Sequence, residues 1–330
     1  MTSPTDIHYM RHALSLAGRG VGRTAPNPAV GCVIVSAGGH IVGRGVTADG
    51  GRPHAEAAAL SQAGDLAKKS TVYVTLEPCS HQGQTPPCAR GLIDAGAARV
   101  VVACGDPDPR VSGRGVAMLR TAGIDVVEGV LEEEALALNA GFFLRITKER
   151  PFVTLKLATS NDHKIADAPG QRTQISGEMA GRFMHLTRSR HDAILVGANT
   201  ARVDRPKLTT RIEGYSHEVR RFVLGASDVQ GLSGITDVDT NDIEAVLNNL
   251  AERGITRLLV EGGAKTHTSF LRAGFCDQFL WVKSPHEIGA GGVDALAGHD
   301  IGQMGVEFGL ELKETRALGE DLLAIYTPSA

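Results

Sequence analysis

Short apolar segments alternate with amphipathic segments along most of the chain, and Gly and Pro residues separate them. Such an alternation is typical of α/β proteins, in which helices connect the strands of a sheet. It is interrupted at Lys148–Pro151, where a basic helix end is followed by a proline, and then starts again. Because 330 residues exceed the usual size of one domain, we predict two α/β domains, residues 1–148 and 149–330.

Hydrophobic periodicity and turn residues place the expected elements. In the first half we expect strands at 30–35, 41–46, 71–76, 100–104 and 125–127, and helices at 6–16, 55–60, 89–95, 115–122 and 132–146. In the second half we expect strands at 153–157, 193–196, 221–224, 257–260, 278–282 and 322–326, and helices at 179–189 and 266–273.

Composition excludes several classes of protein. The net charge of −3 gives no general attraction to nucleic acid or to an anionic membrane, so we expect neither as a partner. The first ten residues lack the pattern of a signal peptide, and no apolar run is long enough to span a membrane. Five cysteines without a secretory signal indicate a cytoplasmic protein, in which clustered cysteines more often bind metal or catalyse.

One group of residue types predicts a catalytic zinc site. His54 stands two residues before Glu56, and Cys79 and Cys88 each follow a proline. One His and two Cys are a proper ligand set for Zn²⁺ whose fourth position stays open to water, which distinguishes a catalytic zinc from a structural one. His54 and Cys88 fall at expected helix starts, where the helix dipole favours a thiolate.

Glu56 is the expected general acid/base at this site. Zinc lowers the pKa of its water to about 7, and Glu56 would take that proton and pass it to the amine that leaves. Zinc deaminases carry this arrangement, although here the two cysteines are more widely spaced. A structural zinc, or unrelated buried cysteines, is the alternative. We expect Cys32 and Cys104, which lie in apolar strands, to be core residues.

A second candidate site follows the expected strand 257–260. Glu261-Gly262-Gly263 leads into a helix there, so the backbone can approach a ligand and the helix start can offer N–H groups to a phosphate. Most Gly-Gly turns between a strand and a helix bind nothing. No Gly-x-Gly-x-x-Gly opens a strand–helix unit, so a standard dinucleotide-binding domain is not supported.

The first half resembles the deaminase domain of RibD, the bacterial bifunctional riboflavin-biosynthesis family. The motifs that carry the resemblance are Asn27–Cys32, His54–Glu56, Glu77–Cys79, Thr85–Cys88 and Gly105–Pro109. The resemblance implies a cytidine-deaminase-like three-layer α/β fold and hydrolytic deamination of a diaminopyrimidinone that carries a ribosylamino 5′-phosphate. It also makes Asn27 and Asp106 candidate substrate contacts, although both precede a proline and are common turn residues.

The second half resembles the reductase domain of the same family, which has a dihydrofolate-reductase-like α/β fold. Matching stretches are Thr154–Ala158, Asp192–Thr200, Asp204–Arg211 and Val260–Gly263. The resemblance implies NADPH as the donor of a hydride to the ribosyl C1′ carbon. It implies NADPH contacts from Ala158, Thr200, Asp204, Gly263, Ala264, Lys265, Thr266, His267, Thr268 and Ser269. It implies substrate contacts from Arg188, Lys207, Arg211 and Glu261, among which the arginines suit a phosphate.

Two positions depart from the family pattern. Gln174 stands where a tryptophan is usual, and Arg172 stands where a serine is common. Gln cannot stack as an indole does, so contacts of this loop are expected to differ. A nucleic-acid deaminase with an appended domain and a non-enzymatic scaffold are the competing hypotheses. The sequence favours a bifunctional enzyme that acts on small phosphorylated pyrimidines, and we expect a homo-oligomer, either a dimer or a tetramer.

Overall fold

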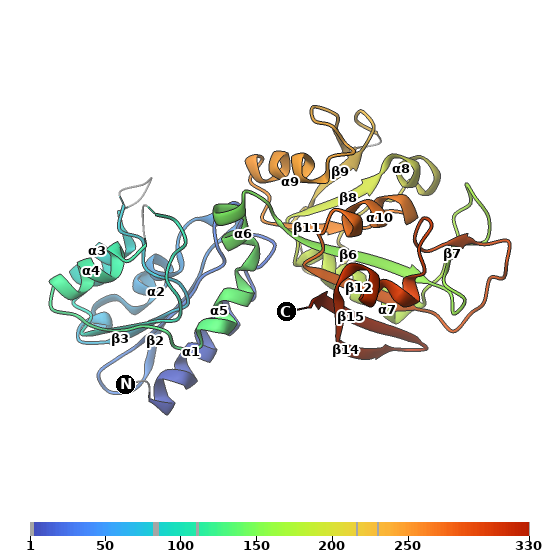
Figure 1. Ribbon diagram of the computed structural model, residues 1–330. Helices are drawn as coiled ribbons and strands as arrows, with labels where there is room; N and C mark the ends of the chain where they lie inside the picture. Colours follow the sequence, from blue (N-terminus) through green and yellow to red (C-terminus); the bar gives the residue numbers. More distant parts are fainter. Residues whose placement is uncertain (1–2, 82–85, 110–111, 216, 230, 330) are drawn as a thin grey trace. The chain divides into compact units, whose positions relative to one another are not determined.

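The computed structural model describes residues 3–81, 86–109, 112–215, 217–229 and 231–329. The chain divides into two compact units, Met1–Lys148 and Glu149–Ala330 (Figure 1). Each unit has its own sheet with helices packed against it, as the alternation of segments predicts for an α/β protein. Among the described residues, no helix combines the length and the apolar character needed to cross a membrane.

The elements of the first unit follow the predicted order closely. They are α1 (Pro4–Ala17), β1 (Gly31–Val35), β2 (Ile41–Val46), α2 (Ala55–Ala63), β3 (Thr71–Val74), α3 (Cys88–Asp94), β4 (Arg99–Val102), α4 (Arg114–Thr121), β5 (Asp125–Val127), α5 (Glu132–Leu138) and α6 (Ala140–Lys148).

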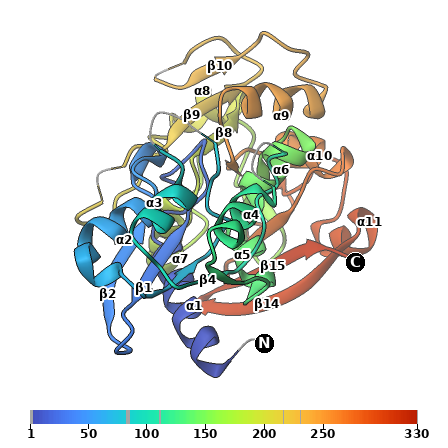
Figure 2. The ribbon, with the colours of Figure 1, turned by 90° about the vertical axis from the view of Figure 1, so that its left-hand side faces the viewer.

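The sheet of the first unit has the order β2-β1-β3-β4-β5. β1 pairs antiparallel with β2 and β3, whereas β3, β4 and β5 run parallel. A Cβ atom on Gly31 would lie 1.9 Å from the Ala13 oxygen of α1, and one on Gly45 would lie 1.9 Å from the Ala55 oxygen of α2. Because Gly45 pairs with Cys32, the neighbour of Gly31, these glycines point to opposite faces. Helices therefore cover both faces, and Figure 2 turns α3 and α4 toward the viewer.

The single helix predicted for residues 132–146 is wrong, because Asn139 interrupts it between α5 and α6. Asn139 is buried, and its side chain accepts a hydrogen bond from the Ala29 N–H (2.9 Å) and donates one to the Ala29 oxygen (3.0 Å). Asn competes with regular helix hydrogen bonding through such contacts. At this break, the Asn139 side chain connects α5 and α6 to the segment that contains Asn27 and Ala29.

The second unit contains more elements than the sequence patterns predicted. They are β6 (Phe152–Thr159), β7 (Lys164–Ala166), α7 (Glu178–Ser189), β8 (Ala193–Gly197), α8 (Ala198–Asp204), β9 (Arg220–Leu224), β10 (Ser233–Ile235), α9 (Ile243–Glu252), β11 (Arg257–Val260), α10 (Ala264–Arg272), β12 (Gln278–Lys283), β13 (Val293–Asp294), α11 (Met304–Phe308), β14 (Leu310–Leu318) and β15 (Asp321–Pro328).

The large sheet of the second unit has the order β10-β9-β8-β11-β6-β12-β15-β14. In this order, the strands from β10 to β12 (β10, β9, β8, β11, β6 and β12) run parallel to one another. β15 and β14 then add an antiparallel edge. The central strands are buried on both faces, as in α/β proteins whose helices cover a parallel sheet. β6, β8 and β11 thus end at one edge of the sheet, which is where ligands bind in open α/β folds.

Candidate active sites

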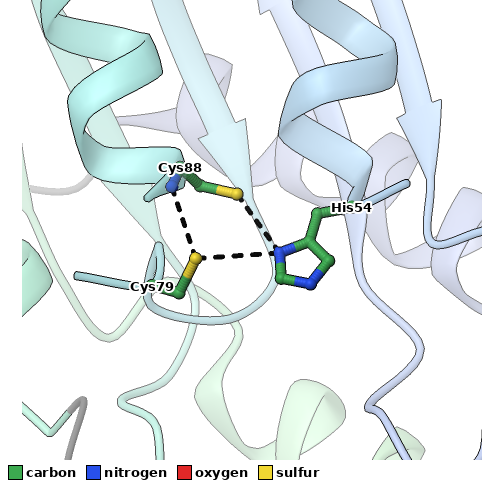
Figure 3. A group of neighbouring side chains, drawn as sticks. All are labelled: His54, Cys79 and Cys88. Carbon is green, nitrogen blue, oxygen red and sulfur yellow. Dashed lines mark hydrogen bonds between the residues drawn. The ribbon is translucent and has the colours of Figure 1, made fainter. Parts of the chain in front are cut away.

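In the first unit, the structure brings together the three predicted zinc ligands (Figure 3). The Nδ1 atom of His54 lies 3.3 Å from the Sγ atom of Cys88 and 3.7 Å from that of Cys79. The three donor atoms all lie within 4.8 Å of one another. Bond lengths of about 2.3 Å to sulfur and about 2.0 Å to nitrogen place tetrahedral ligands roughly 3.6 Å apart, so the group fits Zn²⁺.

Local structure explains how distant segments supply these ligands. His54 is the N-cap of α2, Cys88 is the first residue of α3, and Cys79 lies in the loop that follows β3. The Cys88 N–H donates to the Cys79 sulfur at 3.3 Å. Hydrogen bonds from Cys88 and His54 lower the pKa of Cys79 to about 4, so this thiol is poised as a thiolate. Thr85 of the predicted Thr-Pro-Pro-Cys motif lies outside the described residues.

Glu56 enters the same site from the first turn of α2. Its carboxyl is buried and lies within hydrogen-bond reach of Cys88. Burial raises the pKa of this carboxyl to about 7. A buried carboxyl beside three metal-binding donors is a suitable proton carrier for hydrolysis.

The two predicted substrate contacts of the first unit lie in turns near this site. Asn27 is half-buried and packs against Gly51, where a Cβ atom would lie 1.8 Å from its side-chain nitrogen. Asp106 accepts a hydrogen bond from the Asp108 N–H at 2.8 Å. Burial raises the pKa of Asp106 to about 6. Cys32 and Cys104 are buried in the core, as predicted.

In the second unit, a cavity of about 1010 Å³ opens where β6, β8 and β11 end. Ten of the predicted site residues line it: Ala158, Arg188, Thr200, Asp204, Arg211, Glu261, Gly263, Ala264, Lys265 and Thr266. Ligand pockets commonly measure about 300–1,000 Å³, so this cavity lies at the upper end of that range.

The start of α10 forms one wall of the cavity. Its N-cap, Gly263, has no side chain to bond the first helical N–H groups, so these can face a phosphate. A Cβ atom on Gly262 would lie 2.6 Å from Thr266 Cβ, and one on Gly197 would lie 2.4 Å from Thr266 Oγ1. Gly197 and Gly262 therefore make room for the protein's own Thr266.

Arg188 and Glu261 form an ion pair within the cavity. The Arg188 Nε and Nη2 atoms donate to the two Glu261 oxygens at 2.6 and 2.7 Å, and Nη1 donates to the Thr209 oxygen. Burial opposes ionisation of Glu261, but these bonds hold its pKa below the usual range. The edge of Arg188 that would clamp a phosphate is thus occupied by Glu261.

Two cavity residues were missed as site residues by the sequence analysis. Lys156 lies within β6 and lines the cavity, and burial lowers the pKa of its ammonium group. His185 projects from α7, and its Nε2 atom accepts a hydrogen bond from Arg211 Nε at 3.2 Å. Lys156 could have been found from the sequence, because it is the one charged residue within an apolar predicted strand. No local pattern distinguishes His185.

Four predicted contacts lie away from the lining of this cavity. Lys207 is exposed, and its backbone oxygen accepts from Arg221. His267 is buried and bonds the Gly263 and Lys156 oxygens. Thr268 accepts from the Ala297 N–H, and Ser269 donates to the Lys265 oxygen.

The two positions that depart from the family pattern both line the cavity. The Gln174 side chain donates a hydrogen bond to the Ser176 oxygen at 2.7 Å. The positive charge of Arg172 acts on Asp204, where it opposes the rise in pKa that burial causes. Arg172 therefore brings a cation to the part of the cavity that contains Asp204.

Two family models match the chain, one over each half. The model described as "RibD C-terminal domain" matches residues 151–324. The model described as "Cytidine and deoxycytidylate deaminase zinc-binding region" matches residues 3–104 and therefore includes His54, Glu56, Cys79 and Cys88. These matches support the two predicted fold classes.

Full-length relatives match both halves in the same order. The riboflavin biosynthesis protein RibD of Aquifex aeolicus is 40% identical, with 99% of each chain covered. The structure of Acinetobacter baumannii RibD superposes with a TM-score of 0.89 at 32% identity over 99% of each chain. A diaminohydroxyphosphoribosylaminopyrimidine deaminase/5-amino-6-(5-phosphoribosylamino)uracil reductase from Thermotoga maritima gives a TM-score of 0.84 at 34% identity, over 98% of this chain and 99% of that one.

Proposed function

Because the chain belongs to the RibD family of riboflavin-biosynthesis proteins, we propose that its two units catalyse two consecutive reactions of that biosynthesis. The chain is an enzyme with deaminase and reductase activities, and its cofactors are Zn²⁺ and NADPH. Residues 1–148 remove an amino group from 2,5-diamino-6-(5-phosphoribosylamino)pyrimidin-4(3H)-one by hydrolysis. Residues 149–330 then reduce the ribosyl group of 5-amino-6-(5-phosphoribosylamino)uracil to a ribityl group.

The observation that carries the first activity is the group of His54, Cys79 and Cys88 beside the buried Glu56. These three residues would hold Zn²⁺, which would supply a water acidified to a pKa of about 7. Glu56 takes a proton as the water attacks the ring carbon and returns it to the amine that leaves. The carbon–nitrogen bond breaks, a carbonyl forms and ammonia departs. Asn27 and Asp106 hold the pyrimidine.

The second activity is assigned to the cavity at the ends of β6, β8 and β11. NADPH bound in this cavity would be the source of the hydride that the C1′ carbon of the ribosyl group needs. As the bond between C1′ and the ring oxygen breaks, that oxygen needs a proton. Lys156 is the group we assign to this step, because it lines the cavity and because burial makes its ammonium more acidic. Glu261, which Arg188 keeps ionised, accepts hydrogen bonds from sugar hydroxyls.

The phosphates of the two ligands need separate partners in this cavity. The uncapped start of α10, with Gly263 through Thr266, suits a phosphate of NADPH. Ala158, Thr200 and Asp204 line the same cavity, and we assign them to NADPH as well. Arg211, which His185 orients, is assigned to the substrate phosphate.

An assay with and without NADPH tests this proposal. The purified protein should release ammonia from the diaminopyrimidinone phosphate without NADPH, and should oxidise NADPH only once that product has formed. If ammonia is released but NADPH is never oxidised, the reductase assignment is wrong. The contacts of Lys207, His267, Thr268 and Ser269, a homo-oligomeric state and a cytoplasmic location stay predictions.

A further inference from the structure

Glu77 is a buried carboxylate that the deamination chemistry above does not use. It is 4% exposed and stands two residues before the metal ligand Cys79. A buried carboxylate is costly unless hydrogen bonds replace its lost hydration. The partners of Glu77 therefore indicate what the residue is for.

Within the described part of the chain, the hydrogen bonds to the Glu77 carboxylate come from backbone N–H groups of one later segment. Gly115 (2.9 Å) and Val116 (3.3 Å) donate to Oε1. Gly113 (2.9 Å) and Asp106 (3.4 Å) donate to Oε2. One side chain thus holds both the turn that carries Asp106 and the first turn of α4.

The start of α4 depends on this carboxylate because the N-cap residue of α4 has no side chain that can accept hydrogen bonds from the first helical N–H groups. That N-cap is Gly113, which has a φ of 74° and no side chain to bond the first helical N–H groups. A carboxylate from elsewhere in the chain satisfies these donors and stabilises the positive end of the helix dipole. Glu77 therefore supplies in space the cap that the local sequence lacks.

The backbone of α4 also packs closely against the backbone of Pro78, the residue that follows Glu77. A Cβ atom on Gly115 would lie 1.9 Å from the Pro78 oxygen, so only glycine lets α4 come this near. Pro78 is bonded directly to the metal ligand Cys79. The first turn of α4 thus contacts Glu77 and Pro78, the two residues that precede Cys79.

We propose that Glu77 is a positioning residue of the deaminase site, which holds Asp106 in place beside the metal ligands. The inference rests on the proposed function, because Asp106 is assigned there to the pyrimidine. Asp106 accepts a hydrogen bond from the Asp108 N–H through Oδ1, so its side chain is held within the same turn. Without the Glu77 carboxylate the turn would shift, and Asp106 would lose its alignment with the substrate.

The test is a double-mutant cycle in the full-length zinc-loaded protein. The variants are Glu77→Gln, Asp106→Ala and their combination, with Glu128→Gln as the control because Glu128 is an exposed acid of the same unit. The readouts are zinc content, kcat and KM for the diaminopyrimidinone phosphate, and amide hydrogen exchange at Gly113, Gly115 and Val116. Reductase activity on the phosphoribosylaminouracil is the internal control.

We expect Glu77→Gln to keep its zinc and its reductase activity, to lose amide protection and to raise KM on the order of 10- to 100-fold. The double variant should be no worse than Asp106→Ala alone, because Glu77 acts through Asp106. Additive losses would overturn the proposal, and so would an unchanged KM or a loss of zinc that parallels the loss of activity. Wild-type protein that fails to deaminate the compound would instead contradict the proposed function.

Gly115→Ala tests the same contact if Glu77→Gln does not fold. The added methyl group would lie 1.9 Å from the Pro78 oxygen and 3.2 Å from the Glu77 Oε1 atom, so it must push α4 away from both while the carboxylate itself is retained. We expect the same rise in KM at full zinc content. A Gly115→Ala enzyme with wild-type KM would contradict the proposal.

Discussion

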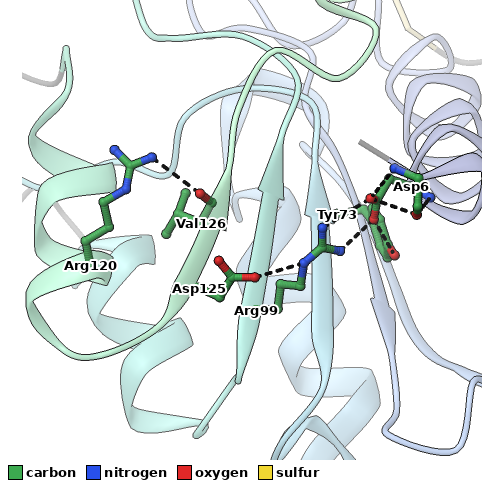
Figure 4. A network of polar contacts seen from close by, with 7 residues as sticks. Asp6, Tyr73, Arg99, Arg120, Asp125 and Val126 are labelled. Carbon is green, nitrogen blue, oxygen red and sulfur yellow. Dashed lines mark hydrogen bonds and ion pairs between the residues drawn. The ribbon is translucent and has the colours of Figure 1, made fainter. Parts of the chain in front are cut away.

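Replacing Asp6 by Ala should destabilise the first unit by about 3 kcal/mol, because it breaks a buried ion pair. Asp6 is 1% exposed and joins the start of α1 to β3 and β4 (Figure 4). Arg99 donates to its two oxygens at 2.6 and 3.1 Å, the Tyr73 hydroxyl donates at 3.2 Å, and the Ser3 N–H and hydroxyl each donate at 2.9 Å.

The magnitude follows from what the substitution leaves behind. Removing one partner of a buried pair commonly costs about 3–5 kcal/mol, since the other charge loses its compensation. Arg99 retains 25% exposure and also bonds Asp125 at 3.1 Å, so water and Asp125 offset part of the loss. The lower end of the range therefore applies. With a urea slope of about 2 kcal/mol per M, the unfolding midpoint should fall by roughly 1.5 M.

The two units can be followed separately in one urea titration. Trp281 is the single tryptophan and lies in the second unit, so its fluorescence reports only that unit. Release of Zn²⁺ to a chromogenic chelator reports the first unit. Asp6→Ala should lower the zinc-release midpoint and leave the fluorescence midpoint unchanged. Asp125→Asn is the matched control, because Asp125 is 68% exposed and such pairs contribute little.

The pH dependence of the same transition has a definite sign. Hydrogen bonds from Arg99 hold the pKa of Asp6 below its usual range. The stabilisation is therefore complete above the unfolded value of about 3.9 and is lost as the pH falls toward the folded value. Asp6→Asn should lack this acid-side loss. Equal zinc-release midpoints for Asp6→Ala and Asp125→Asn would refute the reasoning.

Three further substitutions separate the two sites. Cys88→Ala should lose zinc by metal analysis and abolish ammonia release without slowing NADPH oxidation, and retained stoichiometric zinc would contradict the ligand assignment. Lys156→Met should lower the reductase kcat on the order of 100-fold, measured by NADPH absorbance, whereas an unchanged kcat would exclude Lys156 as the proton donor. Arg211→Ala should raise the reductase KM for the phosphorylated substrate but not for its dephosphorylated form, and equal effects on both would remove Arg211 from the phosphate site.

The sequence predicted which three residues come together as candidate zinc ligands, because these residues carry their own spacing and chemistry. His54 and Glu56 share one helix start, and Cys79 lies in the loop that leads to Cys88 at the start of α3, so the long-range step was only to bring two segments together. The contacts of Glu77 could not be predicted, because its partners are backbone N–H groups of Asp106, Gly113, Gly115 and Val116. Almost every residue has a backbone N–H group, so the sequence does not indicate which of them will bind a distant carboxylate.

Prediction in the second unit was limited by contacts between distant elements. The pairing of Arg188 with Glu261 joins α7 to the end of β11, and neither local pattern indicates it. β14 was missed because its face is mostly charged and exposed, so it lacks the alternation that marks a half-buried strand. The predicted helix over residues 132–146 failed at Asn139 because a side-chain contact with Ala29 competes with helix hydrogen bonding.

The proposed function requires one chain to hold two sites that act in sequence. The most direct measurement gives the full-length Glu56→Gln variant each substrate separately, with NADPH present and NADPH oxidation followed. We predict full zinc content and no oxidation with the diaminopyrimidinone phosphate, but wild-type oxidation with 5-amino-6-(5-phosphoribosylamino)uracil. Oxidation of NADPH with the diaminopyrimidinone phosphate would contradict the order of the steps, and loss of both activities would contradict the separation of the sites.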